Sequence, residues 1–187
     1  MEAGSERRTK LTEGNAAFRK ATDSAIFANL SKNGQHPLMA VLTCSDSRVV
    51  PEKIFNLSIG DAFVVRVAGN TASDPQVLGS LEYAVTHLHV RDLIVLGHTG
   101  CGAIKVALEG RDNGNLWSVT KDIERAKLKV PIELDKDPDA IAESNVRLQM
   151  RLIEDNSFPV REAVERNQLT IHGAMYDLKT GMVRFLS

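Results

Sequence analysis

The sequence predicts an α/β fold: a mostly parallel β-sheet flanked by helices, with an antiparallel edge strand and an N-terminal helical arm. Four short apolar runs bounded by turn-forming residues predict strands, and they lie at residues 38–43, 62–67, 92–97 and 169–177. Segments with helical spacing separate them, as expected for parallel strands joined by crossover helices. A fifth run, residues 182–186, follows the fourth after a Lys-Thr-Gly turn and predicts the antiparallel edge.

The composition fits a single domain covering residues 1–187. Hydrophobic residues make up 43% of the chain, which is enough for a substantial core, and the formal net charge is −1. This charge balance does not favour a nucleic acid or an anionic membrane as partner. No apolar run reaches membrane-spanning length, and the N-terminus lacks the apolar core of a secretory signal. We therefore expect a cytoplasmic protein with no nucleic-acid or membrane partner.

The N-terminal region is predicted to be a polar tail followed by a helical arm. Residues 1–9 are polar and are expected to be mobile. In residues 10–33 apolar side chains recur near helical spacing, and Asn33-Gly34 supplies the stop signal. Because the apolar stripe is narrow, two alternatives stay open. The arm lies on its own domain, or it crosses a partner subunit.

The segments between the strands carry helix signals. A short helical turn at residues 49–55 opens with Pro51, and a loop of small and polar residues covers 68–73. Asp74-Pro75 then combines an N-cap carboxylate with a proline at the first helical position, which predicts a helix start.

The second half of the chain is predicted to be mainly helical before the last two strands. Residues 102–109 form a short helix, and 116–155 form a charged helical region. Pro131 interrupts that region, and Asp137-Pro138 restarts it. Residues 158–167 add one more short helix.

Three residues with metal-binding side chains follow two of the predicted strands. Cys44 comes directly after the first strand, His98 directly after the third, and Cys101 three residues later. Because the carboxyl ends of parallel strands meet at one edge of a sheet, we expect these side chains to converge. Two thiolates and one imidazole are the ligand set of a catalytic zinc with its fourth position open. The sequence therefore predicts one zinc ion per chain, bound by cysteines that stay reduced.

Two charged residues follow the first of these cysteines. Asp46 lies two residues beyond Cys44, and Arg48 lies two residues beyond Asp46. An ionised carboxylate only accepts hydrogen bonds, so Asp46 is expected to orient a zinc-bound hydroxide. The planar fork of Arg48 matches a carboxylate, and we expect it to hold Asp46 ionised and away from the open zinc position.

Plainer interpretations of these residues exist. Two cysteines in a cytosolic domain are usually buried and inert. A Cys-x-Asp-x-Arg stretch also fits a turn with a surface ion pair, worth roughly 0–1 kcal/mol. Glycines 97, 100 and 102 lack the spacing of a phosphate-binding loop. The histidines other than His98 have no cysteine neighbours and are interpreted as packing or surface residues.

Taken together, residues 44–48 (CSDSR) and 98–101 (HTGC) resemble the two signature motifs of the β-class carbonic anhydrases, in particular the plant-like members with an open zinc site. The resemblance covers nearly the whole chain. It implies that Cys44, His98 and Cys101 bind zinc, and that Asp46 and Arg48 form the dyad beside it. The implied reaction is attack of zinc hydroxide on carbon dioxide, which gives bicarbonate and a proton.

Further residues gain roles through this resemblance. Gln35, Phe63 and Tyr83 match residues that contact the substrate or line the small apolar pocket of plant-like members. The backbone N–H of Gly102 is another candidate donor. A linear, uncharged substrate such as carbon dioxide needs a dry pocket with one or two donors, so these assignments make physical sense.

The resemblance also implies a homo-oligomer, a dimer or a multiple of dimers such as a tetramer. In such members the pocket lies at the subunit interface and the N-terminal arm crosses the partner, which favours the partner-crossing alternative for residues 10–33.

The sequence departs from related patterns at two places. Val41 stands where the bicarbonate-inhibited subgroup has a tryptophan, although Arg66 and Tyr176 match the other members of that inhibitory site. We therefore expect a constitutively open zinc site. Residues 67–70 differ from the corresponding loop of the plant-like enzymes, which leaves the pocket's shape open.

Carbonic anhydrase activity is the leading hypothesis, and two others stay open. The same scaffold could hydrolyse carbonyl sulfide or carbon disulfide, which are also small and linear. A zinc-binding scaffold without catalytic activity is the alternative from another class of protein. The presence of Asp46 and Arg48 counts against it.

Overall fold

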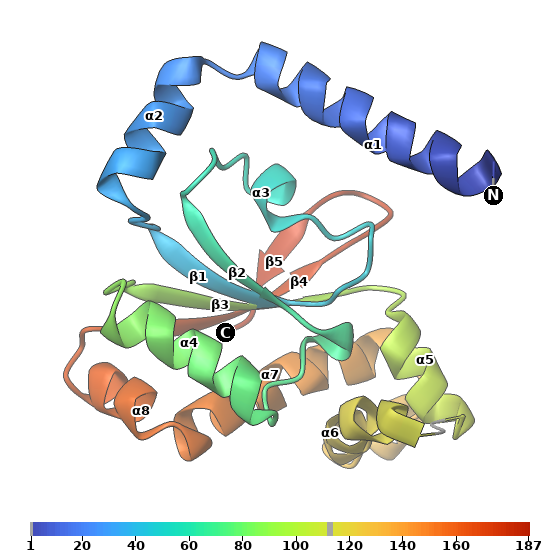
Figure 1. The fold of residues 1–187 in the computed structure, drawn as a ribbon. Helices are drawn as coiled ribbons and strands as arrows, with labels where there is room; N and C mark the ends of the chain where they lie inside the picture. The colour runs from blue at the N-terminus through green and yellow to red at the C-terminus, as the bar shows by residue number, and fades with distance from the viewer. Residues whose placement is uncertain (1, 112–113) are drawn as a thin grey trace. The chain divides into compact units, whose positions relative to one another are not determined.

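The computed structural model describes residues 2–111 and 114–187, and its backbone divides into two compact units, Met1–Gln35 and His36–Ser187. Figure 1 shows the fold coloured from the N-terminus to the C-terminus. Within the described ranges, no helix is both long enough and apolar enough to cross a membrane.

The N-terminal unit contains two helices, α1 (Glu2–Ala21) and α2 (Ser24–Asn33). The predicted helical arm, residues 10–33, is helical but is divided in two, because Asp23 accepts a hydrogen bond from Ala25 N at 2.9 Å and so starts a new helix. Helix α1 also begins before residue 10 and so includes residues 2–9, which were predicted to be a polar, mobile tail. Phe18 and Phe27 contact each other edge to face across the break, with ring centroids 5.7 Å apart.

The second unit is built on a five-stranded sheet with the order β2-β1-β3-β4-β5. The strands are β1 (Met39–Thr43), β2 (Ala62–Arg66), β3 (Asp92–His98), β4 (Thr170–Tyr176) and β5 (Val183–Phe185). The first four run parallel, and β5 pairs antiparallel with β4. The predicted mostly parallel α/β sheet with an antiparallel edge is confirmed.

The register of the sheet brings the ends of β1 and β3 together. Thr43, the last residue of β1, pairs with Leu96 of β3 on one side and with Arg66 of β2 on the other. Cys44 therefore leaves the sheet beside the end of β3, where His98 lies two residues beyond Leu96. The register alone places a thiol next to an imidazole.

The described residues of this unit form the helices α3 (Pro51–Ile54), α4 (Pro75–Thr86), α5 (Gly102–Glu109), α6 (Trp117–Lys127), α7 (Pro138–Asn156) and α8 (Phe158–Glu165). Short 3₁₀ turns lie at Ala68–Asn70, Gly114–Leu116 and Ile132–Leu134. The side chains of Asp74 and Asp137 cap α4 and α7 by accepting hydrogen bonds from backbone amides, as the Asp-Pro pairs predict.

The two faces of the sheet are covered unequally. Figure 1 shows α4, α7 and α8 on one face and the short α3 on the other. Helix α7 packs closely on β3 at Gly97, where a Cβ would lie 2.5 Å from Val146 Cγ2 and 2.8 Å from Met175 Sδ. Because Gly97 directly precedes His98, this tight packing fixes the strand end that carries the imidazole.

Candidate metal centre

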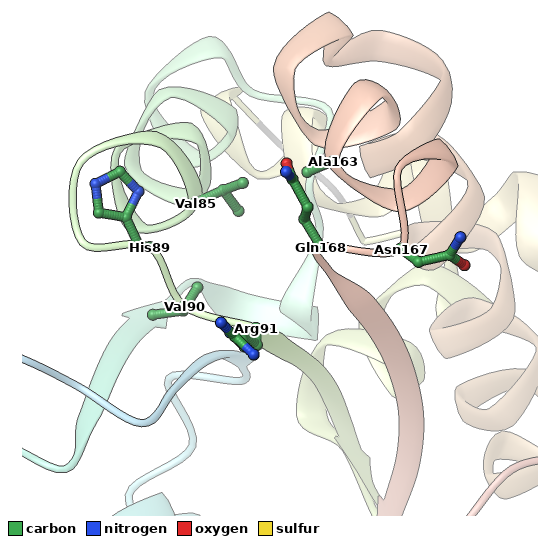
Figure 2. A pocket seen from close by; sticks show the side chains of 7 residues that line it. All are labelled: Val85, His89, Val90, Arg91, Ala163, Asn167 and Gln168. Carbon is green, nitrogen blue, oxygen red and sulfur yellow. The ribbon is translucent and has the colours of Figure 1, made fainter.

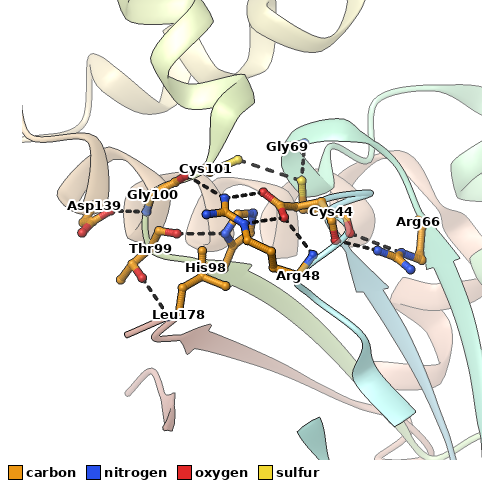
Figure 3. A network of polar contacts seen from close by, with 11 residues as sticks. Cys44, Arg48, Arg66, Gly69, His98, Thr99, Gly100, Cys101, Asp139 and Leu178 are labelled. Atoms are coloured by element: carbon orange, nitrogen blue, oxygen red, sulfur yellow. Dashed lines mark hydrogen bonds and ion pairs between the residues drawn. The ribbon is translucent and has the colours of Figure 1, made fainter. Parts of the chain in front are cut away.

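The structure brings together the three side chains expected to bind a metal. The ligand atoms of Cys44, His98 and Cys101 all lie within 4.8 Å of one another, and the two sulfurs are 4.0 Å apart. All three residues are buried, with exposed fractions of 5% or less. Figure 3 shows them meeting at the carboxyl edge of the sheet.

The imidazole of His98 is oriented for a metal. Its Nδ1 lies 2.9 Å from the carbonyl oxygen of Thr99. A carbonyl only accepts hydrogen bonds, so Nδ1 carries the proton and Nε2 presents a lone pair. That Nε2 is buried and has no hydrogen-bond partner among the described residues. A metal ion would satisfy this buried nitrogen, and a carbonyl that accepts the proton of the other ring nitrogen is a usual support for a metal-binding histidine.

The two thiols are electrostatically coupled. A hydrogen bond from Cys101 is the largest factor that lowers the pKa of Cys44 to about 4, although burial opposes it. The same hydrogen bond, together with burial, raises the pKa of Cys101. These opposite shifts leave the proton of the pair on Cys101 and make Cys44 the ionised sulfur, and a divalent cation would replace that proton. Two soft thiolates and an imidazole suit zinc, so these residues fit the predicted ion.

A backbone loop supports the first sulfur. The N–H of Gly69 donates to Cys44 Sγ at 3.3 Å, and the carbonyl of Gly69 accepts a hydrogen bond from Asn145 Nδ2 at 2.9 Å. Sequence reasoning missed both contacts. The local signal in the sequence is the pair Gly69-Asn70 after β2, and this pair also fits an ordinary turn.

Asp46 and Arg48 form the predicted bidentate pair. Arg48 Nε donates to Asp46 Oδ1 at 2.9 Å, and Nη2 donates to Oδ2 at 2.7 Å. The backbone N–H of Arg48 also donates to Oδ1 at 3.0 Å. The hydrogen bonds from the Arg48 side chain hold the pKa of Asp46 well below its usual range. Asp46 is therefore an ionised acceptor with a fixed orientation.

Arg66 holds the backbone between the cysteine and the carboxylate. Its Nε donates to the carbonyl of Cys44 at 3.3 Å, and its Nη2 donates to the carbonyl of Asp46 at 2.8 Å. On the other side, Gly100 N donates to Asp139 Oδ1 at 2.8 Å, which fixes the turn before Cys101. Figure 3 shows Arg66 beside the backbone at Cys44 and Asp139 beside Gly100. These charged side chains brace the two loops that carry the sulfurs.

Among the residues expected to contact the substrate, Gly102 lies at this edge and Phe63 does not. Phe63 and Tyr83 touch each other, with ring centroids 5.9 Å apart, but Phe63 pairs with Ala40 near the start of β1. Gly102 follows Cys101 directly and opens α5. Gln35 is exposed and is the last residue of the N-terminal unit. Their roles stay predictions.

The opposite end of the sheet holds a cavity of about 360 Å³, lined by Val85, His89, Val90, Arg91, Ala163, Asn167 and Gln168. Figure 2 shows that its polar side chains point in different directions. His89, Arg91, Asn167 and Gln168 are all exposed. Because these groups do not converge, the cavity lacks the arrangement of a built binding site.

Comparisons with known proteins agree with the geometry. Residues 39–183 match a family model described as carbonic anhydrase. Carbonic anhydrase 2 of Mycobacterium tuberculosis is 37% identical over 154 residues, covering 79% of this chain and 73% of the relative. The carbonic anhydrase of Emericella nidulans is 33% identical over 192 residues, covering 95% of this chain and 82% of the relative.

Solved structures extend the likeness to the fold. A structure of two tetrameric β-carbonic anhydrases from Sordaria macrospora superposes with a TM-score of 0.86 at 30% identity, covering 98% of both chains. The β-carbonic anhydrase CafA of Aspergillus fumigatus gives a TM-score of 0.87 at 28% identity, covering 97% of this chain and 91% of that one.

Proposed function

The chain belongs to the β-carbonic anhydrase family, and from this premise we propose that it hydrates carbon dioxide reversibly at one zinc ion held by Cys44, His98 and Cys101. The observation that carries the proposal is the buried, unpartnered Nε2 of His98, which faces two thiols within 4.8 Å. A bound zinc would lower the pKa of a coordinated water and so supply a nucleophile near neutral pH.

Asp46 orients that nucleophile by accepting its hydrogen bond. The low pKa of Asp46, caused mainly by the Arg48 side chain, means that the carboxylate has no proton to donate. Arg48 uses Nε and Nη2 to fix both carboxylate oxygens, which leaves Asp46 little freedom to turn toward the metal itself. We therefore assign Asp46 an orienting role and Arg48 a positioning role.

The carbon dioxide pocket is proposed to form between two copies of the chain. Phe63 pairs with Ala40, four residues before Cys44, so it lies about 13 Å along the strand from its own cysteine at 3.3 Å per residue. Phe63 and its contact Tyr83 are therefore better placed to serve a neighbouring site. Gln35 and the N–H of Gly102 complete the proposed substrate contacts, with the helical arm crossing the partner.

This proposal predicts a homo-oligomer, a dimer or a multiple of dimers. The tetrameric Sordaria enzymes, which share 30% identity with this chain, support that assignment. Sedimentation velocity would test it, and a monomer at micromolar concentration would contradict it. A cytoplasmic location is proposed because both cysteines must remain reduced thiols to bind the ion.

The catalytic proposal is tested by stopped-flow carbon dioxide hydration from pH 6.5 to 9, with zinc content measured on the same sample. We expect about one zinc per chain and a rate that rises through an ionisation. Full zinc occupancy without hydration at any pH would contradict the proposal. Parallel assays with carbonyl sulfide and carbon disulfide would then distinguish a sulfur-substrate hydrolase from an inactive zinc-binding scaffold.

A further inference from the structure

Two buried amide side chains of α7 connect the helix to the sulfur of Cys44. Asn145 and Gln149 are 1% and 0% exposed. Gln149 Nε2 donates to Asn145 Oδ1 at 2.9 Å, and Asn145 Nδ2 donates to the carbonyl of Gly69 at 2.9 Å. The N–H of Gly69 then donates to Cys44 Sγ at 3.3 Å. A chain of polar contacts therefore runs from the middle of α7 to a proposed metal ligand.

Gln149 determines which way the amide of Asn145 faces. An asparagine side chain has one accepting oxygen and a donating NH₂ group. Because Gln149 donates to Oδ1, the nitrogen of Asn145 is directed to Gly69. Gln149 is itself fixed, since its Oε1 accepts a hydrogen bond from Ala72 N at 2.7 Å. Both ends of the segment 69–72 are thus tied to the same helix.

Gly69 passes this constraint on to the sulfur. Its φ is +67°, and a Cβ there would lie 3.0 Å from Ile123 Cδ1, so the position requires glycine. The N–H and the carbonyl of Gly69 belong to different peptide planes that its φ and ψ relate, so Asn145, by holding the carbonyl, fixes the direction of the N–H together with the left-handed conformation of this glycine. The backbone of Gly69 thus makes one hydrogen bond to Cys44 Sγ and another to Asn145 of α7. The position of the Cys44 sulfur therefore depends on α7.

We propose that Asn145 is a positioning residue for the metal ligand Cys44, acting through the backbone of Gly69. The inference rests on the zinc site proposed above and adds a residue outside the two signature motifs. A site with two thiolates donates much negative charge to its ion. A hydrogen bond to one sulfur withdraws part of that charge and fixes where the sulfur lies, as hydrogen bonds to the ligands do in other metal sites.

Three variants separate this role from simple destabilisation of α7. Asn145→Leu keeps the branched shape and the number of side-chain heavy atoms but has no donor for Gly69. Gln149→Met removes the support one step farther from the sulfur. Ser144→Ala is the matched control, because Ser144 donates to the carbonyl of Ala126 at 2.8 Å from the same helix, by a bond that belongs to neither the segment 69–72 nor Cys44.

Two measurements on the metal-loaded proteins test whether Asn145 positions Cys44. We expect zinc release to a chromogenic chelator to be about 10- to 100-fold faster in Asn145→Leu, less so in Gln149→Met, and unchanged in Ser144→Ala. In cobalt-substituted protein, the thiolate-to-cobalt charge-transfer band should move to longer wavelength in Asn145→Leu. Loss of the N–H donor raises the energy of the sulfur lone pairs, which lowers the transition energy.

A folded Asn145→Leu variant with wild-type zinc release and an unshifted cobalt band would overturn the proposal, and so would equal changes in Ser144→Ala. If Asn145→Leu does not fold, zinc release and the cobalt band of Gln149→Met test the positioning role instead.

If the wild-type protein binds neither zinc nor cobalt, the proposed zinc-dependent function is wrong, and the positioning of Cys44 is tested separately. Iodoacetamide labelling of metal-free protein then decides: faster labelling of Cys44 in Asn145→Leu than in wild type and Ser144→Ala supports the role, and equal rates in all three overturn it.

Discussion

The two ends of the central sheet carry similar residue types but differ in what those residues can do. At the amino end, His89 and Arg91 border a cavity of about 360 Å³, and their side chains are exposed and diverge. At the carboxyl end, His98 is 1% exposed and its Nε2 faces two thiols within 4.8 Å. The proposed metal site is therefore distinguished from this cavity by the convergence and burial of its side chains and not by the volume of a cavity.

The largest expected effect comes from removing a ligand at the carboxyl end. In His98→Ala, two thiols remain without the imidazole, so we expect zinc content well below one per chain and hydration reduced by more than about a hundredfold. Metal analysis and stopped-flow assays would measure both. Retention of full zinc and turnover would show that the site does not lie where these three side chains converge.

The next largest effect is expected from Asp46, whose substitution should disturb the orientation of the nucleophile without loss of the metal. Asp46→Asn keeps the size of the side chain but replaces one accepting oxygen with a donor, so we expect hydration to fall about 10- to 100-fold while zinc stays near one per chain. The experiment compares kcat with zinc content in the same preparation. Undiminished kcat in a fully loaded variant would rule out the orienting role.

Replacing Arg48 tests whether the pair acts through orientation or through ionisation. In Arg48→Ala the pKa of Asp46 should rise toward its ordinary value of about 3.9, which still leaves it ionised from pH 6.5 to 9. The loss of rate should therefore be the same factor across that range. A loss confined to the acidic end would indicate ionisation instead.

The same variant predicts a pH dependence of stability. The folded-state pKa of Asp46 is depressed by Arg48, so the stabilisation from the pair is present above the unfolded-state pKa of about 3.9. It is lost as the pH falls through the lower folded-state pKa. Urea unfolding should therefore separate wild type from Arg48→Ala at pH 7 and bring them together in strong acid.

A smaller effect comes from the packing behind the site. In Gly97→Ala the new Cβ would clash with Val146 and Met175, so we expect a loss of about 1–3 kcal/mol in the free energy of unfolding. Gly79→Ala is the matched control in α4, where a Cβ meets no atom within 4 Å, and it should gain about 0.5–1 kcal/mol. Equal changes in both variants would contradict the tight helix–strand packing.

The smallest effect is expected at the amino end. His89→Asn keeps a residue type that tolerates the φ of +55° at this position, and Arg91→Gln removes the cation of the cavity. Both should leave zinc content and hydration unchanged. A severalfold loss of turnover in either variant would break the contrast between the two ends of the sheet.

The strand positions and the convergence of three side chains that could bind a metal were predictable from the sequence because their signals are local. Each strand is a short apolar run between turn residues, and Cys44, His98 and Cys101 follow two such runs directly. The Asp46–Arg48 pair was equally accessible, since its members lie two positions apart.

The remaining features depend on contacts that sequence spacing does not reveal. Asn145 is separated from Gly69 by 76 residues, and an asparagine on a helix usually faces solvent. The break in the helical arm was not predicted, because the apolar spacing continues past Asp23, where the hydrogen bond from Ala25 N starts a second helix. Phe63 and Tyr83 were grouped by the family resemblance, but the register places Phe63 near the start of β1.

Zinc K-edge X-ray absorption on the purified wild-type protein, with metal content measured in the same sample, tests the central claim most directly. We expect about one zinc per chain, two sulfur neighbours at about 2.3 Å and two nitrogen or oxygen neighbours at about 2.0–2.1 Å. A coordination sphere without sulfur, or with a single sulfur, would contradict a zinc site formed by Cys44, His98 and Cys101.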